Sequence, residues 1–254
     1  MRIRLIRHAT LIVEFQSHTF LVDPMLDEPG ARPAIPLTPN SRRNPLVSLP
    51  VPPQEFLSGI EAVLVTHTHA DHWDDAAAAL LPKQMPLFGQ PEDEKKFQAA
   101  GFIEVRSIQD AVTWHELEIT RTGGMHGSGL IAKMLAPVSG YVLRAAGEPT
   151  LYIAGDTVWC RAVETALKKF QPQAIVLNAG GARFLEGDPI TMTAEDVIRV
   201  CQTAPNSQVI AVHMEAINHC LLMRSDLAFQ LEAARVAHQV AIPNDGEWID
   251  LDRS

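Results

Sequence analysis

Histidine and aspartate side chains that could bind metal ions are concentrated in one short stretch, Thr66-His67-Thr68-His69-Ala70-Asp71-His72. Imidazole nitrogen and carboxylate oxygen are the donors that zinc, manganese and iron accept. Two such metals held about 3.5–4 Å apart can lower the pKa of a water molecule and use it as a nucleophile. The stretch therefore predicts a metal site suited to hydrolysis. The alternative, a solvated polar loop, explains so dense a cluster poorly.

The elements on either side predict how this stretch is positioned. Residues 62–66 are an apolar run that predicts a buried strand ending at His67. In extended chain His67 and His69 point to the same side, because strand side chains alternate with a period of two. Residues 74–81 are strong helix formers with acids at their start, which predicts a helix. Asp71 and His72, at the entry to that helix, can then turn toward a second point nearby.

The rest of the chain predicts an α/β layered fold, because strand-like runs are followed by alternating strands and helices. Further strands are expected at residues 3–5, 11–13, 20–22, 102–105, 114–120, 140–145, 150–154, 174–177 and 208–212. Further helices are expected at residues 91–100, 160–169, 194–202 and 226–239. Thr193 with Asp196 predicts a capping box at the start of the third of these helices.

Residues 29–53 form a proline-rich segment that holds eight of the chain's 18 prolines. Proline removes a backbone donor and fixes φ, so the segment is expected to be a loop. Strand signals on both sides suggest an excursion from one domain rather than a linker, and long loops of this kind often act as lids over sites.

Composition limits the class of protein. The chain has 254 residues, 46% hydrophobic and 20% charged, as in an ordinary globular protein, and we expect one domain over 1–254. A net charge of −9 without a basic cluster argues against a nucleic-acid partner. No stretch reaches the roughly 20 apolar residues of a membrane span. The N-terminus lacks a signal-peptide pattern and the cysteines are widely spaced, which favours a cytoplasmic protein. The expected partner is a small-molecule substrate, and a homo-oligomer remains open.

The His-x-His-x-Asp-His pattern after an apolar strand resembles the metallo-β-lactamase superfamily, over nearly the whole chain. The resemblance implies a four-layer αββα sandwich of two mixed β-sheets with outer helices and metals at one edge. It implies three further ligands in chain order: His126, Asp156 and His213. One metal would then be held by His67, His69 and His126, the other by Asp71, His72 and His213, with Asp156 bridging them.

Several finer assignments remain expectations. His219 follows His213 closely and is the alternative last ligand; otherwise it is a candidate catalytic or substrate-facing residue. Arg7-His8-Ala9-Thr10 and Val22-Asp23-Pro24-Met25 resemble a subgroup that includes L-ascorbate-6-phosphate lactonase and the phospholipase D that cleaves N-acylphosphatidylethanolamines. Arg7 departs from the glycine of that pattern. Asp23 is expected to orient a metal ligand. His8 is expected either to support the site or to be a buried histidine bonded to backbone.

The sequence therefore predicts a hydrolase with two divalent metals, zinc first and manganese or iron as alternatives. The resemblance gives Asp71 a catalytic role beside its metal. Arg183 could pair with an anionic substrate or be a solvated loop residue. The expected substrate is a lactone or phosphorylated sugar derivative, with a phosphodiester or phospholipid second. A non-catalytic metal-binding regulatory module is the alternative from another class, although no ligand is missing. A structural zinc site fits poorly, since such sites are closed and usually rich in cysteine.

Overall fold

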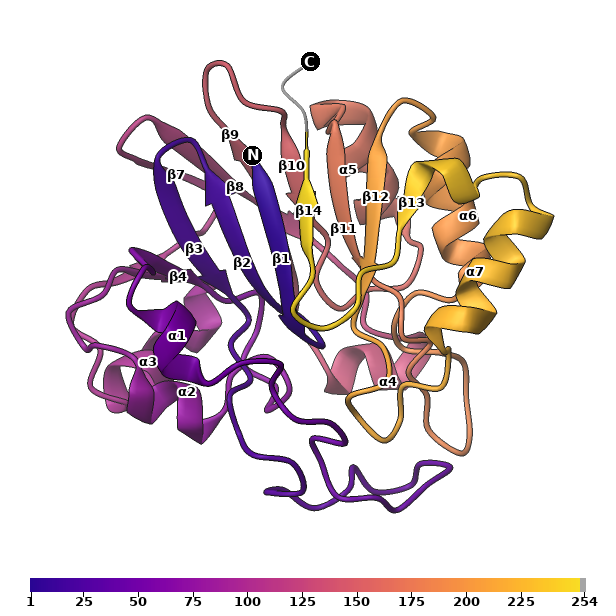
Figure 1. The fold of residues 1–254 in the computed structure, drawn as a ribbon, viewed down its shortest axis with the longest axis horizontal. Coiled ribbons are helices and arrows are strands. Elements are labelled where there is room, and N and C mark those ends of the chain that lie inside the picture. The colour runs from indigo at the N-terminus through magenta and orange to yellow at the C-terminus, as the bar shows by residue number, and fades with distance from the viewer. Residues whose placement is uncertain (252–254) are drawn as a thin grey trace.

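Two mixed seven-stranded sheets form the centre of the molecule (Figure 1). The structure is a computed structural model and describes residues 1–251. The first sheet has the order β14-β1-β2-β3-β4-β5-β6 and the second β13-β12-β11-β10-β9-β8-β7. In each sheet some neighbouring strands are antiparallel and others parallel. β1 and β2 are antiparallel, as are β9 and β10, whereas β3 is parallel to β4 and β10 is parallel to β11. The predicted two-sheet architecture is therefore confirmed.

The strands of the first sheet come mainly from the first half of the chain. They are β1 (Arg2–Arg7), β2 (Thr10–Phe15), β3 (His18–Val22), β4 (Ala62–Leu64), β5 (Leu87–Gly89), β6 (Val105–Ser107) and β14 (Trp248–Asp250). The second sheet contains β7 (Ala111–Trp114), β8 (Leu117–Gly123), β9 (Ser139–Arg144), β10 (Leu151–Ile153), β11 (Ala174–Asn178), β12 (Gln208–Val212) and β13 (Val240–Ala241).

Helices cover the outer face of each sheet (Figure 1). On the first sheet lie α1 (Pro53–Leu57), α2 (Asp75–Leu80) and α3 (Glu94–Ala99), which follows a 3-10 turn, Pro91–Asp93. On the second lie α5 (Arg161–Phe170), α6 (Ala194–Thr203) and α7 (Arg224–Ala233). A short helix, α4 (Gly129–Met134), stands at the end of the sandwich, and a 3-10 turn, Ala237–Gln239, precedes β13. No helix within residues 1–251 is both long and apolar enough to cross a membrane.

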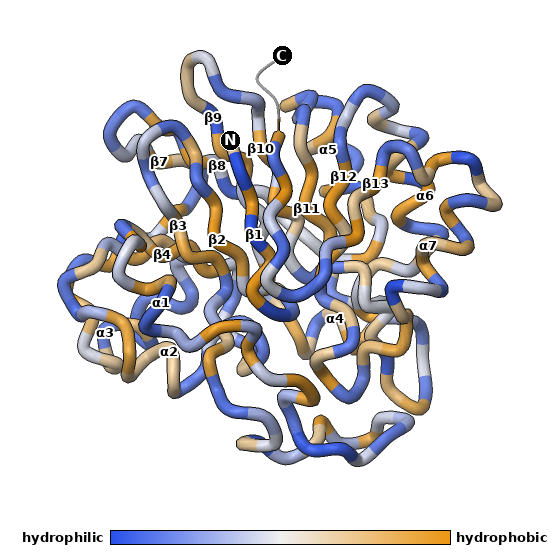
Figure 2. Tube along the Cα trace, in the orientation of Figure 1, coloured by the Kyte–Doolittle hydropathy of each residue, from blue (hydrophilic) through white to orange (hydrophobic). Residues whose placement is uncertain are grey.

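The core lies between the sheets, where apolar residues of both inner faces meet. Figure 2 shows the central strands as largely hydrophobic and the outer loops as largely hydrophilic. Phe15, Phe20 and Phe88 of the first sheet and Tyr141 of the second are fully buried in this cluster. Burial of such large side chains stabilises the fold by about 1.5–3 kcal/mol each. The core thus fixes the two sheets relative to each other and, with them, the loops at their edge.

Local sequence signals account for most elements. The capping box of α6 is present. The Thr193 hydroxyl accepts from the Asp196 backbone N–H, and the Asp196 carboxylate accepts from the Thr193 backbone N–H. The strand expected at residues 114–120 is instead a hairpin: β7 ends at Trp114, His115 adopts a left-handed φ of 52°, and β8 begins at Leu117. The strand expected at 102–105 lies at 105–107, and the helix expected at 226–239 ends at Ala233.

The proline-rich segment has neither helix nor named strand before α1 and lies below the strand ends of both sheets (Figure 1). Asn218, which is fully buried, anchors it. Its side-chain oxygen accepts from the Ile35 backbone (3.0 Å) and from Asn44 (2.7 Å), and its amide donates to Thr38 Oγ1 (2.6 Å) and to the carbonyl of Asn40 (2.8 Å). These hydrogen bonds therefore hold the segment in a fixed position beside the strand ends.

Candidate metal centre

Loops from the same edge of both sheets bring the predicted ligands together. His67, His69, Asp71 and His72 follow β4 of the first sheet. The other three follow strands of the second sheet: His126 comes after β8, Asp156 after β10 and His213 after β12. All but His69 are buried. The tight turn before Asp156 requires Gly155, whose φ is 68° and where a Cβ would lie 2.4 Å from the Ser139 carbonyl oxygen.

The first group of potential ligands is His67, His69 and His126, whose donor atoms lie within 4.8 Å of one another. His67 Nε2 lies 3.0 Å from His69 Nδ1. His126 Nδ1 donates to the carbonyl of Ile190 at 2.7 Å, so its Nε2 carries the lone pair and faces the cluster. Three imidazoles around one point are a donor set that zinc commonly accepts.

Asp156 lies between this group and a second one. Its Oδ2 is 3.4 Å from His126 Nε2 and 4.0 Å from His67 Nε2. Its Oδ1 is 3.3 Å from Nε2 of both His72 and His213. The two oxygens of one carboxylate therefore face two different sets of imidazoles, which is the arrangement that a bridging ligand requires.

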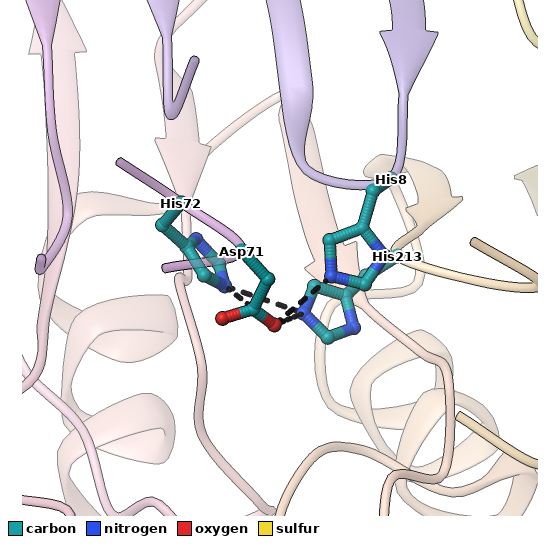
Figure 3. Close-up of side chains that lie close together, drawn as sticks. All are labelled: His8, Asp71, His72 and His213. Carbon is teal, nitrogen blue, oxygen red and sulfur yellow. Dashed lines mark hydrogen bonds and ion pairs between the residues drawn. The ribbon is translucent and has the colours of Figure 1, made fainter. Parts of the chain in front are cut away.

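The second group contains His72, His213, Asp71 and also His8, with donor atoms again within 4.8 Å (Figure 3). His72 Nε2 and His213 Nε2 are 3.3 Å apart. Asp71 Oδ2 lies 3.2 Å from His8 Nε2, 3.7 Å from His213 Nε2 and 3.9 Å from His72 Nε2. His8 was expected near the site as a supporting residue, and the structure places its ring nitrogen within the cluster itself.

Hydrogen bonds behind the cluster orient these side chains. Asp23 accepts from His72 Nδ1 (2.8 Å) and from the Thr66 backbone and hydroxyl (both 2.7 Å). The Thr66 hydroxyl in turn is 3.1 Å from His67 Nδ1, so one carboxylate fixes two histidine rings with Nε2 toward the cluster. Asn178 donates to Asp156 Oδ1 at 2.7 Å. Contacts of this kind set the tautomer and orientation of metal-binding side chains.

The two carboxylates of the cluster are held in their ionised form. Burial alone would raise the pKa of Asp156, but the charges of His213 and His72 outweigh it and hold that pKa well below the usual range. For Asp71, burial acts in the same direction and is outweighed by His72, His213 and His8. Ionised carboxylates are the form that binds cations.

Two of the histidines are held in their neutral form. Burial lowers the pKa of His67 well below its ordinary value, and lowers that of His69. Burial would also lower the pKa of His72, but the carboxylates of Asp156, Asp23 and Asp71 together raise it well above the ordinary value. His72 therefore lies where the local field most strongly attracts a positive charge.

The donor set fits a divalent cation on its own geometry. Because His72 Nδ1 donates to Asp23, neutral His72 has only a lone pair at Nε2. That lone pair faces Nε2 of His213 and Oδ1 of Asp156, each at 3.3 Å. These donors need a positive charge among them, which either a proton kept on His72 by its raised pKa or a bound cation in its place supplies. Imidazole and carboxylate donors together suit zinc, manganese and iron.

A cavity of about 350 Å³ opens onto this cluster. Its polar side presents His69, Asp71, His126 and His219. The remaining lining is mostly apolar and comprises Pro33, Ala34, Ile35, Pro36, Leu135, Phe184, Ile190 and Ile217, with Ala70, Asn44 and Arg32. The proline-rich segment thus supplies one wall of the cavity. Larger surface hollows, such as the one beside Leu167 and Pro205, lie away from the cluster and carry none of its residues.

The structure separates the two remaining candidates, His219 and Arg183. His219 is 5% exposed and lines the cavity, and within residues 1–251 nothing hydrogen-bonds to its Nδ1. Burial lowers the pKa of His219 to about 4, so the ring is neutral at pH 7. The Arg183 side chain is exposed, does not line the cavity and, within residues 1–251, donates a long hydrogen bond, 3.5 Å, to the carbonyl of Gly187. Its position gives no support to a substrate contact.

Sequence reasoning missed several residues that shape the site. Asn178 could have been found, because it ends β11, the parallel neighbour of the strand that leads to Asp156. Cys220 has its Sγ 3.6 Å from His213 Nδ1, and wide spacing was all that the sequence showed of the three cysteines, which are free. No local pattern marks Asn218, whose partners lie far away along the chain, or Arg32, which pairs with the nearby Asp27.

Comparison with known proteins identifies relatives of the whole chain. The model of the β-lactamase superfamily domain matches residues 18–214. The UPF0173 protein YddR of Bacillus subtilis is 38% identical over 250 residues, which cover 97% of this chain and 98% of that protein. Two solved structures are each 37% identical and cover 99% of both chains. One is an isothiocyanate hydrolase from Delia radicum gut bacteria, with a TM-score of 0.94. The other is a possible metal-dependent hydrolase from Veillonella parvula, with a TM-score of 0.96.

Proposed function

Because the chain belongs to the metallo-β-lactamase superfamily and is a metal-dependent hydrolase of its UPF0173 group, we propose that it uses two metal ions to hydrolyse a small uncharged substrate. An isothiocyanate is the first candidate for that substrate. The cavity carries this proposal: it joins the His/Asp cluster to a mostly apolar wall. The 37% identical isothiocyanate hydrolase, which matches over 99% of both chains, supports the choice of electrophile.

Two metal positions are proposed from the way the donors divide. His67, His69 and His126 would hold one cation, and Asp71, His72 and His213 the other, with Asp156 between them. When bound, two such cations lower the pKa of a water molecule and polarise the bond that it attacks. Zinc suits the all-imidazole set, and manganese or iron is compatible with the set that includes a carboxylate.

The reaction proposed for an isothiocyanate is R–N=C=S + H₂O → R–NH₂ + COS. The water oxygen bonds to the central carbon while the C=N pair moves to nitrogen, which takes the first water proton. The second water proton then moves from oxygen to the same nitrogen as the C–N bond breaks, which releases R–NH₂ and COS. Asp71 is 8% exposed and faces the cavity, so its carboxylate can accept a proton from the attacking water. Neutral His219 can hold an N–H toward the nitrogen or sulfur that gains charge.

The lining disfavours a phosphorylated substrate. Of the residues that the structure describes, Arg32 is the only Lys or Arg that lines the cavity. Its Nε is already 2.8 Å from Asp27 Oδ2, so its charge is compensated within the protein. Phosphate groups are normally met by uncompensated Arg or Lys. A phosphorylated sugar or phosphodiester is therefore a weaker candidate than the sequence suggested, whereas an uncharged lactone still fits and stands second.

The test combines metal analysis with a substrate panel. Protein purified without chelator is expected to contain about two equivalents of metal and to consume benzyl isothiocyanate. Turnover of γ-butyrolactone should be slower, and that of bis(p-nitrophenyl) phosphate at least about 100-fold slower in kcat/KM, a difference of roughly 2.7 kcal/mol. Asp156→Ala should lose metal and activity together. Asp110→Ala, which removes an exposed carboxylate outside the cluster, should change neither.

Other outcomes would change the assignment. Faster hydrolysis of the lactone would replace the isothiocyanate as substrate class. Two bound metals without turnover of any class would favour a metal-binding module that lacks catalysis. Absence of metal, even after reconstitution with zinc, manganese and iron, would contradict the proposal.

A further inference from the structure

His8 approaches the cluster from an element that supplies none of the other ligands. It lies in the turn between β1 and β2, is fully buried, and has its Nε2 3.2 Å from Asp71 Oδ2 (Figure 3). Its Nδ1 has no hydrogen-bond partner within residues 1–251. A structural histidine in this turn would be expected to bond to the backbone through that nitrogen. Within the described part of the chain, the polar contact of this ring therefore lies inside the cluster.

The ring of His8 packs against the ring of His213. The His8 backbone has a left-handed φ of 62°, which non-glycine residues adopt rarely and at a cost of order 1 kcal/mol. The His8 carbonyl accepts from the His213 backbone at 2.9 Å, and the two ring centroids are 3.6 Å apart. A backbone hydrogen bond thus joins the strained turn to the residue that follows β12. The side chains of His8 and His213 are therefore positioned together.

The donor atoms of His8, Asp71, His72 and His213 all lie within 4.8 Å of one another. Nitrogen and oxygen bind such cations at about 2.0–2.2 Å, so donor atoms gathered this closely can be directed at one cation. Three imidazole nitrogens approach the same oxygen of Asp71 from different elements. An array of this kind surrounds a point, whereas a simple hydrogen bond would need only one of the three.

We propose that His8 is a fourth protein ligand of the second metal position. The proposal rests on the two-metal site argued above. It makes the two positions unequal: His67, His69 and His126 serve the first, while His8, Asp71, His72 and His213 serve the second, and Asp156 is shared. Four protein ligands and a shared carboxylate suit a cation with five or six ligands, such as manganese, iron or cobalt, better than a tetrahedral zinc.

The variant to test is His8→Asn. Asparagine tolerates the left-handed backbone of this turn but is too short to reach the position of Nε2. His115→Asn is the matched control, because His115 also has a left-handed φ, 52°, and is exposed in the β7–β8 turn. Each protein is stripped, reconstituted with Co²⁺, and followed by visible absorption through the addition of two equivalents. Circular dichroism checks that each variant is folded.

In wild type and His115→Asn, the two Co²⁺ equivalents should give distinct bands, one of them weak as expected for high coordination. In His8→Asn, the band of one equivalent should shift and intensify because a ligand is lost, and the affinity of that equivalent should fall more than the 10–100-fold typical of supporting residues. An unchanged spectrum at saturating Co²⁺, with or without weaker affinity, would overturn the proposal, because His8 would then only orient Asp71. Failure of wild type to bind two equivalents would instead overturn the two-metal function.

Discussion

At the scale of single residues, the buried histidines differ in the hydrogen bonds of their Nδ1 atoms. His72 and His126 each donate through Nδ1, to Asp23 and to the Ile190 carbonyl. His219 has no such contact at Nδ1 within the described chain, although it is 5% exposed. A buried ring without such a partner is free to form a hydrogen bond with a substrate, but its protonation costs free energy because the charge would be buried.

The cost of protonating His219 predicts a pH dependence of stability. Burial lowers its pKa from 6.5 to about 4, so the unfolded chain binds more protons than the folded one between these values. The free energy of unfolding should therefore fall as the pH drops from about 6.5 toward 4. In metal-stripped protein the His219 contribution at pH 4.5 is about 2–3 kcal/mol. Urea unfolding of wild type and His219→Gln at pH 7 and 4.5 checks this.

In His219→Gln the loss between the two pH values should be smaller by that amount, since glutamine does not titrate. Equal losses in wild type and variant would mean that the His219 ring is hydrated or paired in the folded protein.

The sequence predicted these residues unequally. His67, His69, Asp71 and His72 are close together in sequence, so spacing after a strand was enough to predict a site. His126, Asp156 and His213 came only from a resemblance, because no local pattern says that three separate loops meet. The place of His8 inside the cluster depends on a left-handed turn and a ring contact with His213, neither of which a sequence pattern encodes.

At the scale of elements, Asn218 joins the proline-rich segment to the loop that carries His219. The side-chain oxygen and nitrogen of Asn218 and its backbone N–H and C=O all form hydrogen bonds with residues from Ile35 to Asn44. The segment was expected as a lid on composition alone. The segment supplies one wall of the cavity, and its action as a lid stays a prediction. The buried amide of Asn218 shows why the segment needs no regular secondary structure to stay there.

Asn218→Ala should make the proline-rich segment less firmly held. Several buried hydrogen-bonding groups of the segment would lose their partner, at a cost of about 2–4 kcal/mol in the free energy of unfolding. We expect faster proteolysis between residues 29 and 53, a higher KM and metal content that is nearly unchanged. Asn206→Ala, in an exposed turn, is the control. Proteolysis and KM at wild-type values would show that the apolar contacts of the segment hold it without Asn218.

Hydrophobic runs predicted the existence of most elements better than their ends. The apolar run through Trp114 and Leu117 gave no sign of the turn at His115, since histidine, although enriched at left-handed positions, far more often adopts a negative φ. Strands β13 and β14 have two and three residues and were missed. Such short strands exist because the edges of already formed sheets offer free backbone groups to pair with, and this is a tertiary effect.

At the scale of the whole molecule, the cluster joins the two sheets. His67 and His72 follow the first sheet, while His126, Asp156 and His213 follow the second. Any cation shared among these ligands would therefore link the two halves of the sandwich, in addition to the apolar core between them. The resemblance implied this architecture, whereas strand and helix patterns alone supported only an α/β layered fold.

Removal of metal should therefore lower the stability of the entire fold. A ligand that binds only the folded state at 100 times its Kd adds about 2.7 kcal/mol to the free energy of unfolding. Treatment with a chelator should lower Tm in a single cooperative transition, and added metal should restore it. A Tm that does not respond would show that no metal binds the folded state more tightly than the unfolded one, and would contradict the link between the sheets.

The separation of the ligands along the chain has a consequence for how the protein is made. His72 and His213 are 141 positions apart, yet their ring nitrogens are 3.3 Å apart in the folded molecule. During synthesis the candidate ligands from His8 to His72 leave the ribosome long before His213 exists. An ion captured early would meet an incomplete and exposed site. Loading with the correct metal would therefore have to follow completion of the second sheet, when the cellular supply of free ions, rather than the order of translation, decides which metal enters.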